Sequence, residues 1–265
     1  MARDTLSRMI VQQPTPLLQP RLAEIVARQL RQEILSGQYR EGELLPRQLE
    51  LVERFGVSPP SIREALRILE TEGLITVQRG REGGAIVHEP RLEKVAYMLG
   101  MVLQAADVPV SDAIAAWGRL EPTIAAQCAA QEDRGTTIVP VLRANLRLAH
   151  ESIDDGPKFR AVADQFHKEL IAHSTNRTLS YVLTALEALV YPQIRQLNAE
   201  AGFLGPFDEV EIRRASLREH ELMFERIVEG DEAGAYNVAQ EHLSEAHWPT
   251  PLPAEPPIVD AGLLS

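Results

Sequence analysis

The chain has 265 residues, 45% of them hydrophobic, so it can fill one or two apolar cores and is not an intrinsically disordered protein. Its net charge of −11 argues against indiscriminate nucleic-acid binding, and no run approaches the roughly 18 apolar residues of a membrane-spanning helix. The single cysteine, Cys128, excludes an intramolecular disulfide, and with a start that lacks an apolar signal region it favours a cytoplasmic protein.

The charge is distributed unevenly along the sequence. Residues 1–90 contain 12 arginines and 12 acidic residues, so the whole excess of negative charge lies in the remainder. A neutral module of this kind can still bind DNA if its arginines share one face.

Three helices are expected near the N-terminus, after a flexible lead-in over residues 1–20. Apolar residues recur with helical spacing from residue 22 to a stop at Gly37, from Pro46 to Phe55, and from Ser58, which can cap a helix, to Gly73. The residues expected to face the core are Leu22, Ile25, Val26, Leu30 and Ile34 in the first helix, Leu49, Val52 and Phe55 in the second, and Ile62, Ala65, Leu66 and Leu69 in the third.

A β-hairpin is expected directly after the third helix. Residues 74–77 and 85–87 are rich in β-branched and aliphatic residues, and the segment between them contains several glycines. Three helices and a hairpin over residues 21–89 are the layout of a winged helix-turn-helix, which is a DNA-binding module.

The third helix has side chains suited to the major groove. Ser58 and Ser61 supply hydroxyls near its start, and Arg63 and Arg67 share a face because they lie four apart. The alternative for Arg67 is an ion pair with Glu64 or Glu70 on a solvated helix face. The hairpin tip adds three residues that can reach the minor groove, Arg79, Gly80 and Arg81.

These residues resemble the DNA-binding domain of the GntR family. The resemblance is carried by Leu45-Pro46, Phe55-Gly56-Val57-Ser58, Arg63-Glu64-Ala65-Leu66, Leu69-Glu70, Gly73-Leu74-Ile75 and Gly83-Gly84-Ala85-Ile86-Val87. It implies a homodimer that binds an operator with two-fold symmetry. Where the family often has arginines, this chain has Pro59 and Leu49, and Arg47 is the candidate for a substitute phosphate contact.

Beyond Pro90 the sequence predicts an all-α domain over residues 91–248, followed by a Pro-rich, loosely attached tail over residues 249–265. Prolines and glycines separate about seven helical segments. The expected helices cover residues 91–105, 110–132, 136–153, 157–174, 177–199, 207–229 and 231–247. The predicted fold is therefore mostly α, with a winged helix-turn-helix and a helical bundle.

This second region resembles the FCD domain of the FadR subgroup of the same family. The residues that carry the resemblance are Leu120-Glu121-Pro122, Phe166-His167, Leu170, Asn176, His220, Gly230-Asp231 and His242. It implies an effector-binding and dimerising domain. In such domains an Asp and three histidines hold a divalent metal near a pocket for a small carboxylate.

The candidate ligands of a zinc- or nickel-type ion are Asp164, His167, His220 and His242, because imidazoles suit such ions. The family has its aspartate four residues before the first histidine, where this chain has Ala163, whereas Asp164 lies three before. Three alternatives remain: three histidines completed by water or effector, no metal at all, or three core histidines joined by hydrogen bonds.

Trp117 and Arg119 are the candidates for the effector pocket. Metal-type members have an arginine for the effector's carboxylate where this chain has Trp117, which favours a larger effector such as an acyl-CoA or a ring-containing acid. Arg119 is the candidate for a replacement cation, with a surface arginine as the alternative.

Together these features predict a regulator of transcription, released from DNA by a small carboxylate or an acyl-CoA, and not an enzyme. A metal-free, FadR-like regulator of lipid or acid metabolism is the first alternative. A metal-dependent enzyme with a DNA-binding head lacks a recognisable catalytic motif in this sequence. An architectural DNA protein would not need so large a helical domain.

Overall fold

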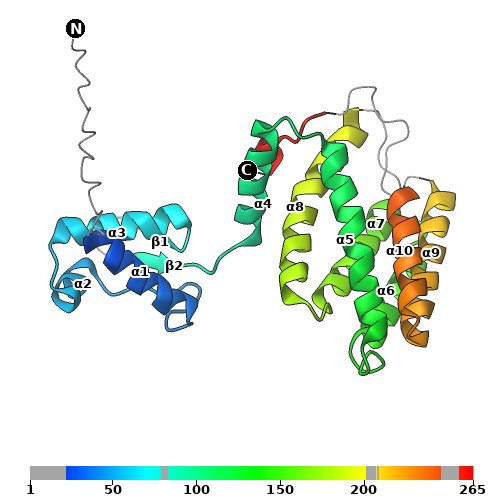
Figure 1. The fold of residues 1–265 in the computed structure, drawn as a ribbon, viewed down its shortest axis with the longest axis horizontal. Coiled ribbons are helices and arrows are strands. Elements are labelled where there is room, and N and C mark those ends of the chain that lie inside the picture. The colour runs from blue at the N-terminus through cyan, green and yellow to red at the C-terminus, as the bar shows by residue number, and fades with distance from the viewer. Residues whose placement is uncertain (1–21, 79–82, 201–206, 208, 246–256, 265) are drawn as a thin grey trace, which may run out of the picture. The chain divides into compact units, whose positions relative to one another are not determined.

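The computed structural model describes residues 22–78, 83–200, 207, 209–245 and 257–264 (Figure 1). The chain divides into two compact units, Met1–Pro90 and Arg91–Ser265, and each unit has its own apolar core. The described part of the chain has three α-helices and one two-stranded sheet before residue 90, and seven α-helices after it. The mostly α fold that the sequence predicts is thereby confirmed.

The N-terminal unit is a three-helix module with a β-hairpin. Its elements are α1 (Leu22–Leu35), α2 (Gln48–Phe55), α3 (Pro59–Glu72), β1 (Ile75–Val77) and β2 (Ala85–Val87). The strands pair antiparallel, with Thr76 opposite Ile86, and α3 packs against α1, α2 and β1. The tight turn between α2 and α3 uses Gly56 at φ 62°, a left-handed conformation that glycine adopts without a side-chain clash.

The apolar face of α2 differs from the sequence prediction. Leu51 is fully buried, whereas Leu49 is 72% exposed. Since α2 has only eight residues, it can bury a single narrow stripe against α3, and the stripe passes through Leu51. Leu22 and Ile25 of α1, which were also expected to face the core, are exposed.

The C-terminal unit is a bundle around α5. Its elements are α4 (Leu92–Ala105), α5 (Val110–Ala130), α6 (Ile138–Glu151), α7 (Gly156–Ala172), α8 (Arg177–Glu200), α9 (Val210–Glu229), α10 (Glu232–Glu245) and a short 3-10 helix, η1 (Ala261–Leu264). Figure 1 shows α5 between α8 and α10, and it also contacts α7 and α9. Trp117 on α5 and Phe159 and Phe166 on α7 are among the largest fully buried side chains. None of the described helices combines the length and apolarity needed to cross a membrane.

The end of the chain is attached more firmly than the sequence suggests. The backbone of Val259 donates to the carbonyl of Val108, and Gln193 on α8 exchanges two hydrogen bonds with the backbone of Asp260. Val259 is fully buried and Ala261 is 4% exposed. Residues 257–264 therefore join α4 to α8, because their apolar side chains pack against the bundle. Residues 249–256 lie outside the described residues.

Candidate metal centre and DNA interface

Three histidines from three helices meet in the core of the C-terminal unit. His167 lies on α7, His220 on α9 and His242 on α10, and each is 1% exposed. The Nε2 atoms of His220 and His242 are 3.1 Å apart, and the Nε2 atom of His167 lies 3.3 Å from each of them. The structure thus brings together three of the four candidate metal ligands.

Packing between aromatic rings fixes the direction of these imidazoles. The ring of His220 stacks on Phe166 with 4.3 Å between centroids and 5° between planes. The rings of His167 and His242 lie 5.2 Å apart and 13° from parallel. Because these rings pack against one another in a tight core, the imidazoles cannot turn their Nε2 atoms apart without breaking the packing.

Two carboxylates are hydrogen-bonded to the Nδ1 atoms of two of the rings. Nδ1 of His167 is hydrogen-bonded to Glu121 on α5, which is fully buried, and Nδ1 of His242 lies 2.6 Å from Glu219 on α9. An ionised carboxylate only accepts hydrogen bonds, so in the neutral imidazoles the proton is on Nδ1. The Nε2 lone pairs of His167 and His242 then face the same point, which is an arrangement that a cation stabilises.

The ionisation of the two rings differs. Burial opposes the charged form of His167, but the charge and hydrogen bond of Glu121 outweigh it, and its pKa is raised. For His242 burial outweighs the hydrogen bond to Glu219, and its pKa is lowered. A neutral imidazole is the form that binds a metal ion.

The triangle of nitrogens has the size that a divalent metal requires. Metal–nitrogen bonds of about 2.0–2.1 Å place neighbouring nitrogens about 2.8–3.4 Å apart, with the shorter separations in octahedral and the longer in tetrahedral geometry. The sides of 3.1 and 3.3 Å fall in this range. Among the described residues, the three histidines form the group of His, Cys, Asp and Glu side chains that could hold a metal ion. Their ligand atoms all lie within 4.8 Å of one another.

The fourth candidate ligand, Asp164, is not part of this group. It is half-buried on α7, three residues before His167, and burial raises the pKa of its carboxyl. The α7 residue that faces the core at this level is Ala163, which is 2% exposed. A difference of one position turns a helical side chain by about 100°, so the small alanine takes the inward position and Asp164 is turned away from it.

Trp117 lies next to the histidines, and Arg119 does not. The Trp117 ring is 1% exposed, 6.4 Å from the ring of His167 and 5.5 Å from that of Tyr191 on α8. Arg119 is exposed, because residues two apart on a helix do not share a face. The expectation that Arg119 meets an effector beside Trp117 is therefore not supported by its position.

A second buried carboxyl, Glu187 on α8, is 5% exposed and near this site. Burial, followed by the charge of Glu121, raises its pKa to about 7, whereas the ordinary value is about 4.3. When the pKa of a carboxyl is higher in the folded protein than in the unfolded chain, ionisation of the group favours the unfolded chain. The free energy of unfolding is therefore highest below the pKa of the unfolded chain and falls as the pH rises towards 7.

We therefore expect the Glu187→Gln variant to gain stability over the wild type as the pH rises. The gain at pH 8 relative to pH 5 should be roughly 1–3 kcal/mol, because an amide cannot ionise. Melting temperatures of the metal-free proteins at both pH values measure it, with the exposed Glu225→Gln on α9 as the matched control. Parallel pH profiles for wild type and Glu187→Gln would contradict the raised pKa.

The N-terminal unit presents the residues of the candidate DNA interface on α3. Ser58 precedes the first helical residue, and its hydroxyl lies 3.0 Å from that of Ser61 and does not cap the helix. Arg63 is exposed, and Arg67 donates two hydrogen bonds of 3.1 Å to Glu64. Arg67 therefore adopts the ion pair that the sequence left as its alternative.

Arg47 lies at the entrance to α2, where it lines a cleft. The cleft lies between the start of α2, Leu66 of α3 and the base of the hairpin at residues 83–85. The exposed Leu49 lines it as well. An arginine and an apolar side chain thus share the concave surface beside α3.

The wing residues Arg79, Gly80 and Arg81 lie outside the described residues. The strands next to them are well fixed, since the backbone of Gln78 donates to the carbonyl of Gly84 and Glu70 of α3 accepts from the backbone of Val77. The hairpin base is therefore tied to α3.

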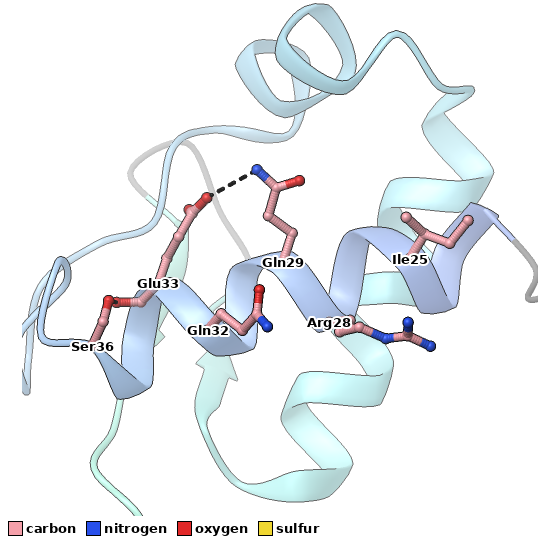
Figure 2. Close-up of a pocket in the computed structure, with 6 residues that line it drawn as sticks. All are labelled: Ile25, Arg28, Gln29, Gln32, Glu33 and Ser36. Carbon is pink, nitrogen blue, oxygen red and sulfur yellow. Dashed lines mark hydrogen bonds between the residues drawn. The ribbon is translucent and has the colours of Figure 1, made fainter.

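A shallow hollow on α1 contains none of the candidate residues. Figure 2 shows its lining, with the amide of Gln29 donating to Glu33 at 3.3 Å. Glu33 also pairs with Arg54 of α2, so its carboxylate joins two helices and has a structural role. The residues that line the hollow are Ile25, Arg28, Gln29, Gln32, Glu33 and Ser36.

The carboxylates around the histidines were not predicted from the sequence. Glu219 directly precedes His220, yet it contacts His242 on the next helix. Glu187 has no motif around it, and its only signal is an acidic residue among the apolar residues of α8. Glu121 lies within the quoted Leu120-Glu121-Pro122 sequence, but that pattern does not say which histidine it would contact.

Comparison with protein families identifies both units. Residues 22–83 match the profile described as bacterial regulatory proteins, gntR family. Residues 112–245, which are half of the chain, match the FCD domain.

Individual proteins resemble the chain over most of its length. The HTH-type transcriptional repressor NanR of Edwardsiella tarda is 28% identical over 89% of this chain and 88% of its own length. The protein of the same name from Citrobacter rodentium is 27% identical over 88% of this chain and 87% of its own. A solved structure described as Streptococcus agalactiae GntR has the same fold, with a TM-score of 0.63, 22% identity, and 84% of this chain and 97% of that chain covered.

Proposed function

The chain belongs to the gntR family of bacterial regulatory proteins and carries an FCD domain, so it is a ligand-responsive DNA-binding transcription regulator, and we propose that it is a repressor released by a small carboxylate. The relatives named NanR are repressors, which supports the sign of regulation. A regulator of this kind acts on the bacterial chromosome, and we place it in the cytoplasm. Its family consists of regulators, which supports a protein without catalytic activity.

We propose that residues 21–89 bind double-stranded DNA with α3 in the major groove. Ser58, Ser61 and Arg63 lie at or near the N-terminal end of α3, where such helices meet base edges, and Arg67 lies one turn further on. Arg47 would contact a phosphate from the cleft beside α3. Arg79, Gly80 and Arg81 are assigned to the wing contact from their position in the sequence alone.

We propose that residues 91–248 also hold two protomers together on an operator with two-fold symmetry. The helix α4 supports this, since it buries only Ala96 and Gly100 fully and has no charged residue from Val95 onwards. A helix that is apolar on nearly all sides needs a cover, and a second copy of the same uncharged face is complementary to it. The large apolar side chains that α4 exposes are Val95, Tyr97, Met98, Leu99, Met101 and Val102.

His167, His220 and His242 would hold a divalent metal of the zinc or nickel type. The observation that carries this proposal is the triangle of Nε2 atoms, backed at two corners by carboxylates that fix the lone pairs inwards. A bound ion would supply a positive charge with open positions for the oxygens of a carboxylate effector. Asp164 is not needed for this, since three histidines leave those positions free.

Control of DNA binding then follows from differential affinity. An effector that binds one arrangement of the protomers more tightly than the other shifts the population towards it. The change in operator affinity can be no larger than the ratio of effector affinities for the two arrangements.

The metal content of the protein tests the site directly. We expect full-length protein, purified without an affinity tag or added metal, to contain about one divalent ion per chain by inductively coupled plasma mass spectrometry. Protein stripped with a chelator should take up one equivalent of Zn²⁺ or Ni²⁺ in a calorimetric titration. An absence of both would make the three histidines structural and would overturn this part of the proposal.

A further inference from the structure

One face of α8 buries polar side chains that the histidine triangle does not use. Glu187 and Tyr191 lie four residues apart and so share a face. The Oε1 atom of Glu187 and the hydroxyl of Tyr191 are buried and have no hydrogen-bond partner among the described residues, and the same holds for Oε2 of Glu121. Buried polar atoms without a partner are rare in folded proteins and indicate a group that pairs with them.

These atoms lie beside the proposed metal centre. Glu121 contacts His167, and the Trp117 ring lies 6.4 Å from the ring of His167 and 5.5 Å from that of Tyr191. Glu187 and His167 are close enough to affect each other's ionisation. The unpartnered atoms and the histidine triangle therefore lie in the same part of the core.

The unpartnered atoms have one chemistry in common. The two carboxylate oxygens accept hydrogen bonds, and the Tyr191 hydroxyl can both accept and donate. Such a lining pairs with O–H and N–H groups. An acyl chain in the same place would leave buried carboxylates next to hydrocarbon, which is unfavourable.

We propose that Glu187 and Tyr191 form a donor-recognising subsite, so that the effector is a small acid bearing hydroxyl or ammonium groups and not an acyl-CoA. The proposal rests on the carboxylate effector of the proposed function and deepens it. Trp117, which the sequence associates with a larger apolar effector, here packs its ring near His167 and Tyr191.

Four ligands with the same six-carbon chain test the proposal on full-length, metal-loaded protein. They are hexanoate, gluconate, 6-aminohexanoate and hexanoyl-CoA, titrated by calorimetry. We expect gluconate or 6-aminohexanoate to bind at least tenfold more tightly than hexanoate. A preference for gluconate assigns hydroxyl recognition, and a preference for 6-aminohexanoate assigns ammonium recognition. Equal or tighter binding of hexanoate or hexanoyl-CoA, or no binding of any of the four, overturns the proposal.

Variants locate the preference on α8. Glu187→Leu and Tyr191→Phe should each reduce the preference over hexanoate at least tenfold, whereas the exposed Glu225→Gln should leave it unchanged. Without ligand, Glu187→Leu should also melt at a higher temperature than the wild type, because it removes an unpartnered buried carboxyl. A preference that survives in both α8 variants overturns the proposal.

Metal content measured in the same samples separates the two levels of inference. Protein that holds its metal but shows no preference for donor-bearing acids contradicts the subsite alone. Protein that binds neither metal nor any of the four acids contradicts both the subsite and the proposed function.

Discussion

We expect the His220→Ala variant to bind a divalent metal roughly a hundredfold or more weakly than the wild type. Loss of a partner outside the ligand sphere typically costs 10–100-fold in metal affinity, and loss of a direct ligand costs more. His220 is the corner whose Nε2 lies 3.1 Å from His242 and 3.3 Å from His167. Without it, two nitrogens remain, and the ion loses a third of its protein ligands.

Thermal unfolding with and without metal measures this loss. At a metal concentration about 100 times the dissociation constant, binding to the folded state adds about 2.7 kcal/mol, which raises the melting temperature of the wild type by several degrees. His220→Ala should show almost no rise. His150→Ala, on the surface of the same unit, is the matched control and should behave as the wild type. An undiminished rise in His220→Ala would refute the assignment of this residue.

The Arg63→Ala variant should bind operator DNA roughly 5- to 150-fold more weakly than the wild type. Arg63 is exposed near the start of α3, where an arginine can reach a guanine edge, and such a contact is worth about 1–3 kcal/mol. Arg67→Ala should cost less, because Arg67 is already paired with Glu64 and must leave that pair to reach DNA.

Fluorescence anisotropy with a site selected from random DNA by the wild-type protein measures these affinities. The matched control is Arg147→Ala, another exposed arginine, on α6, which should leave the affinity unchanged. Sequence specificity provides a second reading, since Arg63→Ala should also relax the preference at one base pair of each half-site. If Arg63→Ala bound the selected site as tightly as the wild type did, α3 would not be reading base edges through this residue.

The order and type of the elements follow closely from the sequence. Helix stops such as Gly37, Gly73 and Gly230 are local signals, because a left-handed residue ends a helix whatever surrounds it. The seven helices after residue 90 were separated by prolines and glycines in the same way. The winged helix-turn-helix was also predictable from the sequence, since its turn at Gly56 and its hairpin are short-range features.

Tertiary packing decided the details that the sequence missed. Helical spacing on α2 allows either Leu49 or Leu51 to face inwards, and only contact with α3 selects Leu51. The attachment of residues 257–264 depends on Gln193, which is far away in the sequence. Local patterns have no information about either contact.

The candidate metal centre was likewise only partly predictable from the sequence. Three histidines on three helices could be picked out from the family resemblance, and the structure brings them together. The partners Glu121 and Glu219 could not, because each belongs to a helix other than that of the histidine it contacts. The position of Asp164 outside this group depends on one step of helix rotation, which only the packing of Ala163 reveals.

Occupancy of the C-terminal site should change the affinity of the protein for its operator. The experiment measures, by anisotropy, the operator affinity of the metal-loaded wild type and of His220→Ala with gluconate, 6-aminohexanoate, hexanoate or hexanoyl-CoA. We predict that at least one of the donor-bearing acids weakens operator binding of the wild type severalfold and leaves that of His220→Ala unchanged. Operator binding that responds to none of the four, or that responds equally in both proteins, would contradict the claim.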